Sequence, residues 1–449
     1  MLSGRYIKEI FKLAWPIWIT QAIQTLMVTI DLLMSAQVSE NDMAAVGTAL
    51  SIWHLVYFFS LGVIMVLSPI LSRHYGRSDY PALAKDLMQG VWLALFICLI
   101  STAALLFSTG FLEYLGLDAP LVRIGSEYLQ YLAYGIPFIC LMAVLRFLNE
   151  AVGQTKPLMI ISSTGMAINV ALNYLFIYGS PITPALGGAG CGVATSLVNL
   201  YILIAMWFYS NRAAYTKPII DQLSFAWPNF STLLHQLKLG LPIGLTILME
   251  IALFAAVALA IATYGTAAAA AHQIALNVTT NFYMIPLSIG MATTVLVGQR
   301  IGQQKFKEAK KVSQSAITMS LIFAAFSCTT IYFTRPYFIP LFTDQAEIIV
   351  LAGTLLMWAA VFQFPDALQT VFASALRAYA DTRFPMLMVL IAYWCVGFPF
   401  GYFVAQNGIG DYQPGVAAYW QGLLISLSAA AILLYIRLRI FYKKSSDLL

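Results

Sequence analysis

The chain has 449 residues and a formal net charge of +5, with 60% hydrophobic and only 10% charged residues. A soluble domain carries about 25% charged residues, so a soluble protein of this composition would expose apolar surface that it could not cover. Apolar runs of about 20 residues, each long enough to cross a bilayer core, recur from end to end. The composition therefore excludes a soluble protein and indicates an integral membrane protein, for which we expect no nucleic-acid partner.

The first apolar run follows Arg5, Lys8 and Lys12, a charge pattern that secretory signals share. This run is longer than a signal core of about 7–15 residues, and further apolar runs follow it. We therefore interpret it as a membrane helix that is retained, and we predict an all-α integral membrane protein. The twelve predicted transmembrane helices span 11–36, 47–72, 87–108, 126–148, 157–179, 189–210, 239–263, 272–299, 312–333, 347–376, 384–406 and 415–436.

The basic residues between these helices predict the orientation of the chain. With both termini in the cytoplasm, only Arg123 and Arg335 of the 24 Lys and Arg fall on the outer side. Basic residues in short loops resist translocation, so such an asymmetry supports an even number of spans. We expect a multi-pass protein with cytoplasmic termini.

The sequence repeats itself at about half its length. The shift that places Leu13 on Leu239 aligns Leu13-Ala14-Trp15-Pro16-Ile17 with Leu239-Gly240-Leu241-Pro242-Ile243, Ala44-Ala45 with Ala270-Ala271, and Gly76 with Gly302. A second similarity pairs Leu145-Arg146 and Thr155-Lys156-Pro157 with Leu376-Arg377 and Thr382-Arg383-Phe384-Pro385. The repeat predicts two six-helix lobes that are related by a pseudo-twofold axis.

We place the N-terminal lobe at residues 1–213, a cytoplasmic linker at 214–238 and the C-terminal lobe at 239–449. Halves of this kind usually meet at a central cavity, and rocking of the halves exposes that cavity to one side and then to the other. The alternative is a duplicated sequence that forms a rigid bundle.

Three apolar spans each hold one acidic residue away from their ends: Asp31, Glu250 and Asp366. A carboxylate at the bilayer centre costs at least about 2.5–3.5 kcal/mol, so it is retained only where it is protonated, paired or facing water. No Lys or Arg stands at the same depth in the sequence, which leaves a cation site or a proton site. Capping of a helix end is the alternative for Asp31 and, because Pro365 precedes it, for Asp366.

Asn169 and Asn173 are four residues apart in the fifth span, so they share one face of that helix. From this face they could hydrogen-bond a protonated or cation-loaded Asp31. The alternative is that the two amides join neighbouring helices, which is a common role of polar residues in membranes.

Gln273, Asn277 and Asn281 form a polar stripe on the eighth span, with Tyr283 just beyond it. We interpret the stripe as the wall of a water-facing cavity, and packing between helices is the alternative. Aromatic faces attract organic cations by about 0.5–2 kcal/mol each. The further candidates for a substrate cavity are Gln24, Phe254 and Phe282.

The sequence shows no catalytic constellation and no phosphate-binding loop of the form GxxxxGK[ST]. The five cysteines stand alone in apolar runs at Cys98, Cys140, Cys191, Cys328 and Cys395. We interpret them as small buried residues. We therefore expect no enzyme and no cofactor, and a pump of this kind would draw its energy from an ion gradient or from another chain.

At this point the chain resembles the multidrug and toxic compound extrusion (MATE) family, in its bacterial NorM-like branch. The resemblance covers nearly the whole chain. It rests on Pro16 through Asp31 with Asp42-Met43-Ala44-Ala45-Val46, on Asn169-x-x-x-Asn173-Tyr174 with Gly187-Gly188-Ala189-Gly190-Cys191-Gly192-Val193-Ala194-Thr195, on Leu241-Pro242-Ile243 with Glu250 and Ala270-Ala271-His272-Gln273, and on Asp366-Ala367-Leu368-Gln369 with Leu376-Arg377.

The resemblance implies a V-shaped twelve-helix antiporter of the bacterial inner membrane that expels organic cations such as drugs in exchange for Na⁺ or H⁺. We expect this antiporter to be a monomer. It implies that Glu250 and Asp366 form the cation site, with Na⁺ as the candidate metal and Tyr283 as an aromatic neighbour. It also implies that Asp31 acts with Asn169 and Asn173 in the N-terminal lobe. The sequence Gln363-Phe364-Pro365-Asp366 lacks the further acids that this branch often carries for binding drugs.

Other functions remain as alternatives at this stage. A transporter of the major facilitator type would fit twelve helices, and Ser72-Arg73-His74-Tyr75-Gly76-Arg77 weakly resembles its loop motif, although the expected Asp is missing. A flippase for lipid-linked precursors would have about fourteen spans and a basic cavity. A membrane enzyme would need paired catalytic residues, and a channel would conduct ions without counter-transport.

Overall fold

The computed structural model describes residues 4–114, 116, 118–181, 183–408 and 415–446. These residues contain no β-strand, and they form 12 helical segments that are long and apolar enough to cross a membrane. The predicted all-α membrane protein with twelve spans is therefore confirmed. The helices are α1 (Gly4–Ala36), α2 (Glu40–Ile64), α3 (Leu67–Gly76), α4 (Tyr80–Tyr114), α5 (Ala119–Ala151), α6 (Lys156–Tyr178), a 3₁₀ turn (Gly187–Ala189), α7 (Gly190–Arg212), α8 (Lys217–Ile220), α9 (Phe230–Ala262), α10 (Thr266–Gly302), α11 (Phe306–Phe338), a 3₁₀ turn (Ile339–Leu341), α12 (Ala346–Ala378), α13 (Arg383–Leu390), a π-helix (Ile391–Gly397), α14 (Phe398–Asn407) and α15 (Ala417–Ser446).

The chain forms two compact units, each with its own internal contacts. The first unit contains Trp15–Gly244, and the second contains the residues up to Ala14 and those from Leu245 onward. Both boundaries fall within helices, so α1 and α9 each contribute to both units. The predicted division into 1–213, 214–238 and 239–449 follows spans and a linker, and it stays a prediction.

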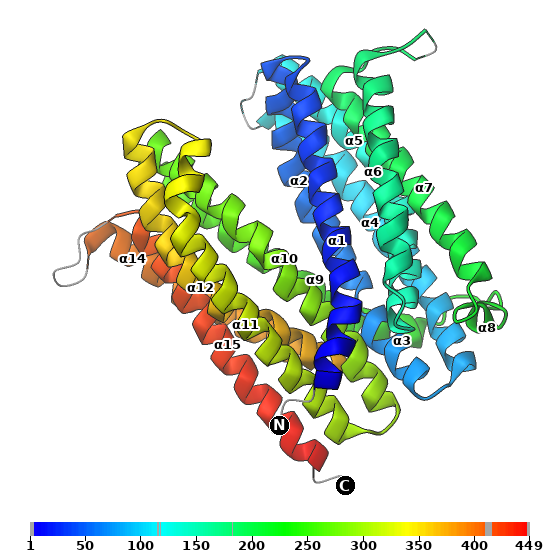
Figure 1. Cartoon of the computed structure of the whole chain (residues 1–449). Coiled ribbons are helices and arrows are strands. Elements are labelled where there is room, and N and C mark those ends of the chain that lie inside the picture. The colour runs from blue at the N-terminus through cyan, green and yellow to red at the C-terminus, as the bar shows by residue number, and fades with distance from the viewer. Residues whose placement is uncertain (1–3, 115, 117, 182, 409–414, 447–449) are drawn as a thin grey trace. The chain divides into compact units, whose positions relative to one another are not determined.

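In the first unit, α5 is the central helix and packs against α2, α4 and α7 (Figure 1). Its buried residues run along most of its length. Gly135 of α5 lies so close to Ser196 of α7 that a Cβ atom at this glycine would collide with the serine hydroxyl. Small residues at such crossings let membrane helices approach closely. The close approach at Gly135 fixes the position of α7 against α5.

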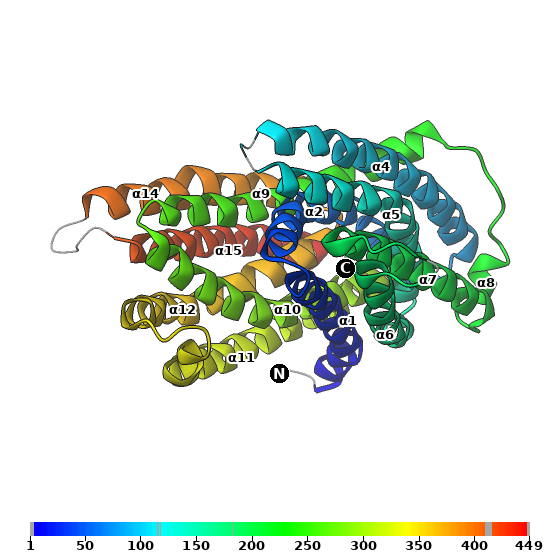
Figure 2. The same cartoon turned by 90° about the horizontal axis from the view of Figure 1, so that it is seen from above.

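In the second unit, α12 has the central place and packs against α10, α11 and α15. Seen from above, α14 and α15 run side by side (Figure 2). The beginning of α1 completes this unit, because Tyr6 and Ile10 belong to the same apolar cluster as Ile289 of α10. Glu9 adds an ion pair of 2.8 Å to Nη2 of Arg300.

The helix bounds follow the predicted repeat. The shift that places Leu13 on Leu239 carries α1 onto α9, end to end. The same shift carries the span Glu40–Gly76 onto α10. A shift longer by one residue carries α5 onto α12. The first, second and fourth spans of the two halves therefore have matching lengths.

One detail of the predicted repeat is wrong. The bounds of α5 and α12 place Glu150, and not Arg146, at the position of Arg377. The turns agree with this register, because Gly153 (φ 81°) and Ala380 (φ 59°) both have left-handed backbones just after the helix end. The similarity of Leu145-Arg146 to Leu376-Arg377 is thus coincidental, since helix length and turn geometry fix the register.

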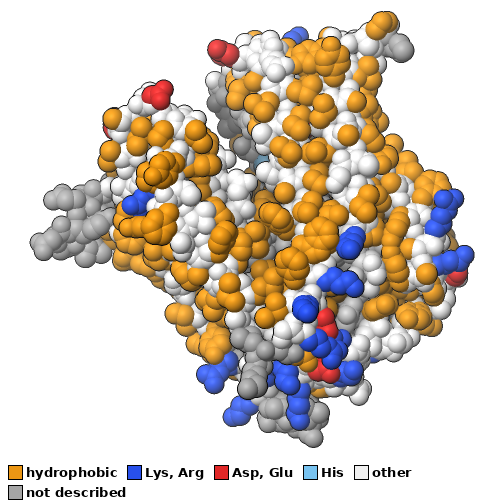
Figure 3. Space-filling view, viewed as in Figure 1, with side chains coloured by type: hydrophobic (Ala, Val, Ile, Leu, Met, Phe, Trp, Pro, Cys, Tyr) orange, Lys and Arg blue, Asp and Glu red, His pale blue; other side chains and the backbone are white. Residues whose placement is uncertain are grey.

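The outer surface carries many hydrophobic side chains. Figure 3 shows them over much of the visible face, where Lys and Arg side chains are fewer. Exposed apolar side chains of this kind are expected on helices that face lipid.

Candidate functional site

Asp31 of α1 is buried, at 3% exposure, among helices of the first unit. Asn173 of α6 donates a hydrogen bond from Nδ2 to Asp31 Oδ1 at 2.6 Å, and Thr195 of α7 donates from Oγ1 to Asp31 Oδ2 at 3.0 Å. Asn173 Nδ2 also lies 3.2 Å from Oδ1 of Asn169. The structure thus brings the predicted acid and both predicted amides together, and each carboxylate oxygen accepts a hydrogen bond from a neutral donor.

Among the described residues, Oδ1 of Asn173 has no hydrogen-bond partner, while Asn169 adds an interaction with the Asp31 carboxyl group. Both side chains are fully buried. A buried polar atom without a hydrogen-bond partner costs free energy. Binding of a cation or a proton donor to Asn173 Oδ1, next to the Asp31 carboxyl group, would remove this cost. The Asp31 cluster, defined as Asp31, Asn169, Asn173 and Thr195, therefore has oxygen atoms suited to a small cation or to a proton donor.

The backbone beside Asp31 is also tied to α7. Ser35 Oγ donates to the carbonyl oxygen of Asp31 at 2.8 Å, and Cys191 Sγ donates to the same oxygen at 3.4 Å. Ser35 Oγ and Cys191 Sγ lie 3.3 Å apart. These hydrogen bonds fix the position of α1 along α7, and they thereby fix the position of the Asp31 carboxylate.

A second buried acid of this unit, Asp42, has a different role. Ser39 donates from Oγ to Asp42 Oδ2 at 2.6 Å, and the backbone N–H of Gly188 donates to Asp42 Oδ1 at 2.6 Å. Cβ atoms at Gly187 or Gly188 would lie within about 3 Å of Asp42 Oδ1. Asp42 therefore fixes the glycine-rich segment at the start of α7. Each of its carboxylate oxygens already accepts a hydrogen bond from the protein.

Glu250 of α9 and Asp366 of α12 lie in one site of the second unit. Asp366 is 3% exposed, Glu250 is half-buried, and the two carboxyl groups interact electrostatically. Tyr283 of α10 and Tyr393 of the π-helix interact with both acids. Tyr393 donates its hydroxyl to Oε1 of Gln369 at 2.7 Å. The structure thus brings together the three residues predicted for the cation site and adds Tyr393 to them.

Arg377 of α12 lies near these acids, against the prediction that no basic residue stands at their depth. It follows Asp366 by about 16 Å along the same helix, at about 1.5 Å per residue. Its guanidinium nevertheless interacts with Glu250 and Tyr283, and Nη2 donates to Ser374 Oγ at 2.8 Å. A basic residue therefore does influence Glu250, although Arg377 stands about three helical turns from Asp366 in the sequence.

Gln273, Asn277 and Asn281 all lie on an exposed face of α10. Asn277 Nδ2 donates to the carbonyl oxygen of Gln273 at 2.9 Å, and Asn281 Nδ2 donates to that of Asn277 at 2.8 Å. The amide oxygens of the stripe thus remain available to other groups. The interpretation of this stripe as a cavity wall stays a prediction.

The other cavity candidates are two aromatic residues of the second unit and one amide of α1. Phe254 and Phe282 pack partly buried on the apolar core of the second unit, and the ring of Phe254 meets that of Phe362 edge to face at 6.2 Å. Gln24 is half-buried. Under the repeat of α1 and α9, Gln24 stands at the position of Glu250. The same place in the two halves thus holds a neutral amide in one and a carboxylate in the other.

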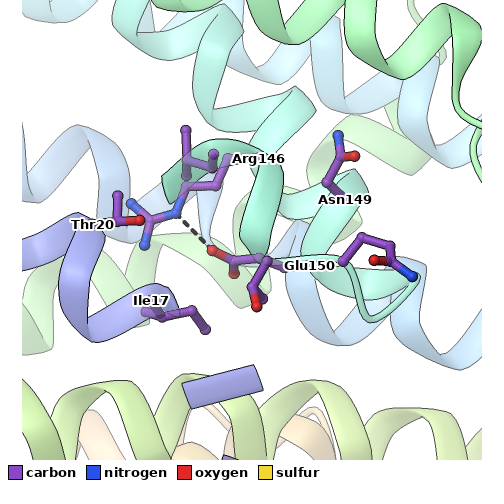
Figure 4. A pocket seen from close by; sticks show the side chains of 8 residues that line it. Ile17, Thr20, Arg146, Asn149 and Glu150 are labelled. Carbon is purple, nitrogen blue, oxygen red and sulfur yellow. Dashed lines mark hydrogen bonds and ion pairs between the residues drawn. The ribbon is translucent and has the colours of Figure 1, made fainter. Parts of the chain in front are cut away.

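Figure 4 shows a small recess of the first unit in which Arg146 and Glu150 of α5 form a buried ion pair. Arg146 Nε lies 2.7 Å from Glu150 Oε1, and the two side chains are only 4% and 3% exposed. Thr20 and Ile17 of α1 lie beside the pair. A buried ion pair is weak evidence for stability. The pair of Arg146 and Glu150 shows that the first unit also holds buried charges.

Sequence reasoning did not single out Thr195, Tyr393 or Glu150. The spacing of Arg146 and Glu150, four residues apart, is a signal for a helical ion pair that was available in the sequence. Thr195 and Tyr393 reach the acids from other helices, so only the packing of those helices reveals them. Among the described residues, no three His, Cys, Asp or Glu side chains form a group that could hold a metal ion by themselves.

Comparison with known proteins gives consistent matches to one group of transporters. The family model MatE matches residues 16–175 and again 242–403, so it recognises each half of the repeat. A probable multidrug resistance protein NorM of Pasteurella multocida is 38% identical over 433 residues, covering 96% of this chain and 93% of that protein. The multidrug resistance protein MdtK of Photorhabdus laumondii is 35% identical, covering 99% of this chain and 98% of that protein.

Solved structures of MATE transporters resemble the fold of this chain. The crystal structure of the eukaryotic MATE transporter AtDTX14 matches with a TM-score of 0.88 at 17% identity, covering 99% of this chain and 98% of that one. At this level of identity the structural match supports the fold, whereas the sequence matches support the family.

Proposed function

This chain belongs to the MatE family of multidrug efflux transporters, and from this premise we propose that it exports organic cations by antiport against Na⁺ or H⁺. It is a multi-pass membrane protein and a transporter rather than an enzyme. The family assignment sets aside the major facilitator and flippase alternatives. We place the protein in the bacterial inner membrane with both termini in the cytoplasm, and we expect a monomer without a bound cofactor.

The observation that carries the proposal is the cluster of Glu250, Asp366, Tyr283 and Tyr393 on membrane-spanning helices of the second unit. Two carboxyl groups that interact inside a membrane repel each other when both are ionised. A cation between them, or a proton on one of them, removes that repulsion. The hydroxyl and carboxyl oxygens form the hard ligand set that Na⁺ requires, and the same groups can carry a proton, so the cluster fits either coupling ion.

In this mechanism the coupling ion and the drug bind in turn. Uptake of Na⁺ or H⁺ neutralises the charges of Glu250 and Asp366 and so weakens the attraction for an organic cation. Release of the ion restores that attraction. Alternating access then exposes the loaded site to one side of the membrane and the emptied site to the other. Asp31 with its amides contributes a second group that can hold a proton or an ion.

Efflux of a fluorescent cationic dye from proteoliposomes, under Na⁺ and pH gradients imposed one at a time, tests the proposal. We expect one gradient or both to drive dye movement by the wild-type chain, and Glu250→Gln to abolish the driven component. Glu347→Gln is the matched control, because Glu347 is exposed at the start of the helix that carries Asp366. Driven transport by Glu250→Gln at the wild-type rate would overturn the assignment of the site.

A further inference from the structure

The connection between α8 and α9 exposes three large aromatic side chains. Phe225 is 68% exposed, Trp227 is 77% exposed, and Phe230 at the start of α9 is 79% exposed. We call residues 221–230 the aromatic strap. Aromatic side chains have about 150–250 Å² each, so three that are mostly bare form a patch of a few hundred Å². Contiguous apolar patches of this size mark contact with a partner or a membrane.

The backbone of the strap is held firmly to α4. Gln89, only 1% exposed, donates from Nε2 to the carbonyl oxygen of Trp227 at 3.2 Å and accepts from the backbone N–H of Asn229 at 2.7 Å. Trp92 donates from Nε1 to the carbonyl oxygen of Ala226 at 2.9 Å. These hydrogen bonds hold the strap in place on α4, while its three aromatic side chains remain mostly exposed.

The aromatic rings also join the strap to the surface of α4. The ring of Phe225 meets the ring of Trp92 edge to face at 6.2 Å, and it meets the ring of Trp227 at 5.5 Å. These contacts make the side chain of Trp92 part of one aromatic surface with the strap.

This aromatic surface continues into the outward face of a membrane span. About one helical turn beyond Trp92, α4 begins a run of exposed apolar side chains that includes Phe96 at 49%, Leu99 at 70% and Phe107 at 83% exposure. The run lies in the candidate span Tyr80–Glu113. In a membrane protein such a face meets lipid, so the strap lies at the end of a lipid-facing surface.

From this continuity we infer that the aromatic strap is buried in the headgroup region of the bilayer leaflet on the side where α4 and α9 begin. Trp and Tyr rings collect at this depth because the region accepts an apolar body together with a polar edge. Lys217 and Lys238 flank the strap on either side in sequence. Basic residues at this position are attracted by anionic lipid headgroups. The inference depends on the membrane spans alone and not on the transported substrate.

Spin labelling of the full chain in phosphatidylcholine vesicles tests this depth directly. A nitroxide is attached at Trp227→Cys in a Cys395→Ser background, since Cys395 is the exposed cysteine among the five. Oxygen concentrates in the bilayer core and the water-soluble nickel chelate in water, so we expect the ratio of their collisions with position 227 to lie between the ratios at a lipid reference and a water reference. A ratio equal to that of the water reference would overturn the inference.

Two further labelled positions calibrate the measurement. Glu347→Cys lies outside the strap, at the exposed start of α12, so it provides the reference for water. Phe107→Cys provides the reference for lipid. Low accessibility of position 227 to both reagents would mean that another protein surface covers it. If this protection vanished when the chain was diluted to one copy per vesicle, the cover would be a second copy, and the inference would again fail.

A second measurement uses tryptophan fluorescence and so needs no label on the strap. Lipids brominated near the headgroup quench the fluorescence of tryptophan side chains at that depth. We expect Trp227→Phe to lose part of the quenched fluorescence, while lipids brominated near the chain end show no such difference. An unchanged quenched fraction in the variant would contradict the headgroup location.

Discussion

The two acidic sites of this molecule differ in the groups that surround their carboxyl groups, which are neutral at one site and charged at the other. Asp31 accepts hydrogen bonds from the neutral side chains of Asn173 and Thr195. Glu250 and Asp366 instead interact with each other, and Glu250 also interacts with the charged side chain of Arg377. A site held by neutral donors tolerates both protonation states with little rearrangement. A site built from opposing charges changes its balance whenever a cation enters or leaves, so we expect it to dominate the coupling.

The largest effect should come from removing a charge of the second unit. Asp366→Asn leaves Glu250 without its acidic neighbour, and we expect the binding free energy of the coupling ion to weaken by about 3 kcal/mol. This corresponds to roughly a hundredfold loss of affinity. The concentration of Na⁺ or H⁺ that gives half-maximal dye exchange measures the change.

The same assay on Asp31→Asn gives the comparison. A shift as large as that of Asp366→Asn would show that the two sites contribute equally, and the distinction drawn here between neutral donors and opposing charges would not hold.

A smaller effect of opposite sign should follow from removing Arg377. Its guanidinium competes with an incoming cation for Glu250, so Arg377→Gln should tighten binding of the coupling ion by roughly 1.4 kcal/mol, or tenfold. Titration of dye exchange with Na⁺ at fixed pH, and with H⁺ at fixed Na⁺, measures this. Arg439→Gln is the control, because Arg439 is an exposed arginine of α15. Weaker ion binding in Arg377→Gln would mean that the arginine organises the site rather than competing for it.

The smallest effect should come from one neutral donor at Asp31. Thr195→Val keeps the shape of the side chain but removes its hydrogen bond to Oδ2. A hydrogen bond to a charged group contributes about 1.5–3 kcal/mol, and the Asn173 bond remains. We therefore expect lower thermal stability in detergent with only a few-fold change in driven dye exchange. Thr195→Ser, which retains the hydroxyl, should restore stability, and a transport loss in Thr195→Val that Thr195→Ser does not rescue would argue for a steric cause.

Much of this architecture is predictable from sequence because a membrane restricts what each segment can do. Apolar runs predict the spans, and the repeat predicts the equal lengths of α1 and α9. The spacing of Asn169 and Asn173 predicts that they share a face, since helical geometry is local. The helices extend beyond the predicted spans, as α4 does at both ends, because a helix continues into the headgroup region where hydrophobicity no longer reports on it.

The contacts between helices are what the sequence does not predict. Thr195 lies in a recognisable motif, yet nothing local shows that α7 delivers its hydroxyl to Asp31. Tyr393 stands in a π-helix, and such an irregularity inside a membrane span has no clear sequence signature. The electrostatic influence of Arg377 on Glu250 joins two different helices, α12 and α9, so sequence spacing does not show it. In each case the decisive distance joins side chains from segments that are remote along the chain.

The crossing of α1 and α9 between the two units has a consequence for how the halves are made. Tyr6, Ile10, Leu13 and Ala14 complete the apolar core around Ile289 in the second unit, while residues 230–244 belong to the first. A fragment that ends in the linker would therefore lack residues 230–244, which complete its own unit. It would also carry the start of α1, which packs in the other unit. Expression of the halves as separate polypeptides should yield aggregates from either alone, and recovery of a native assembly should require both to be synthesised together.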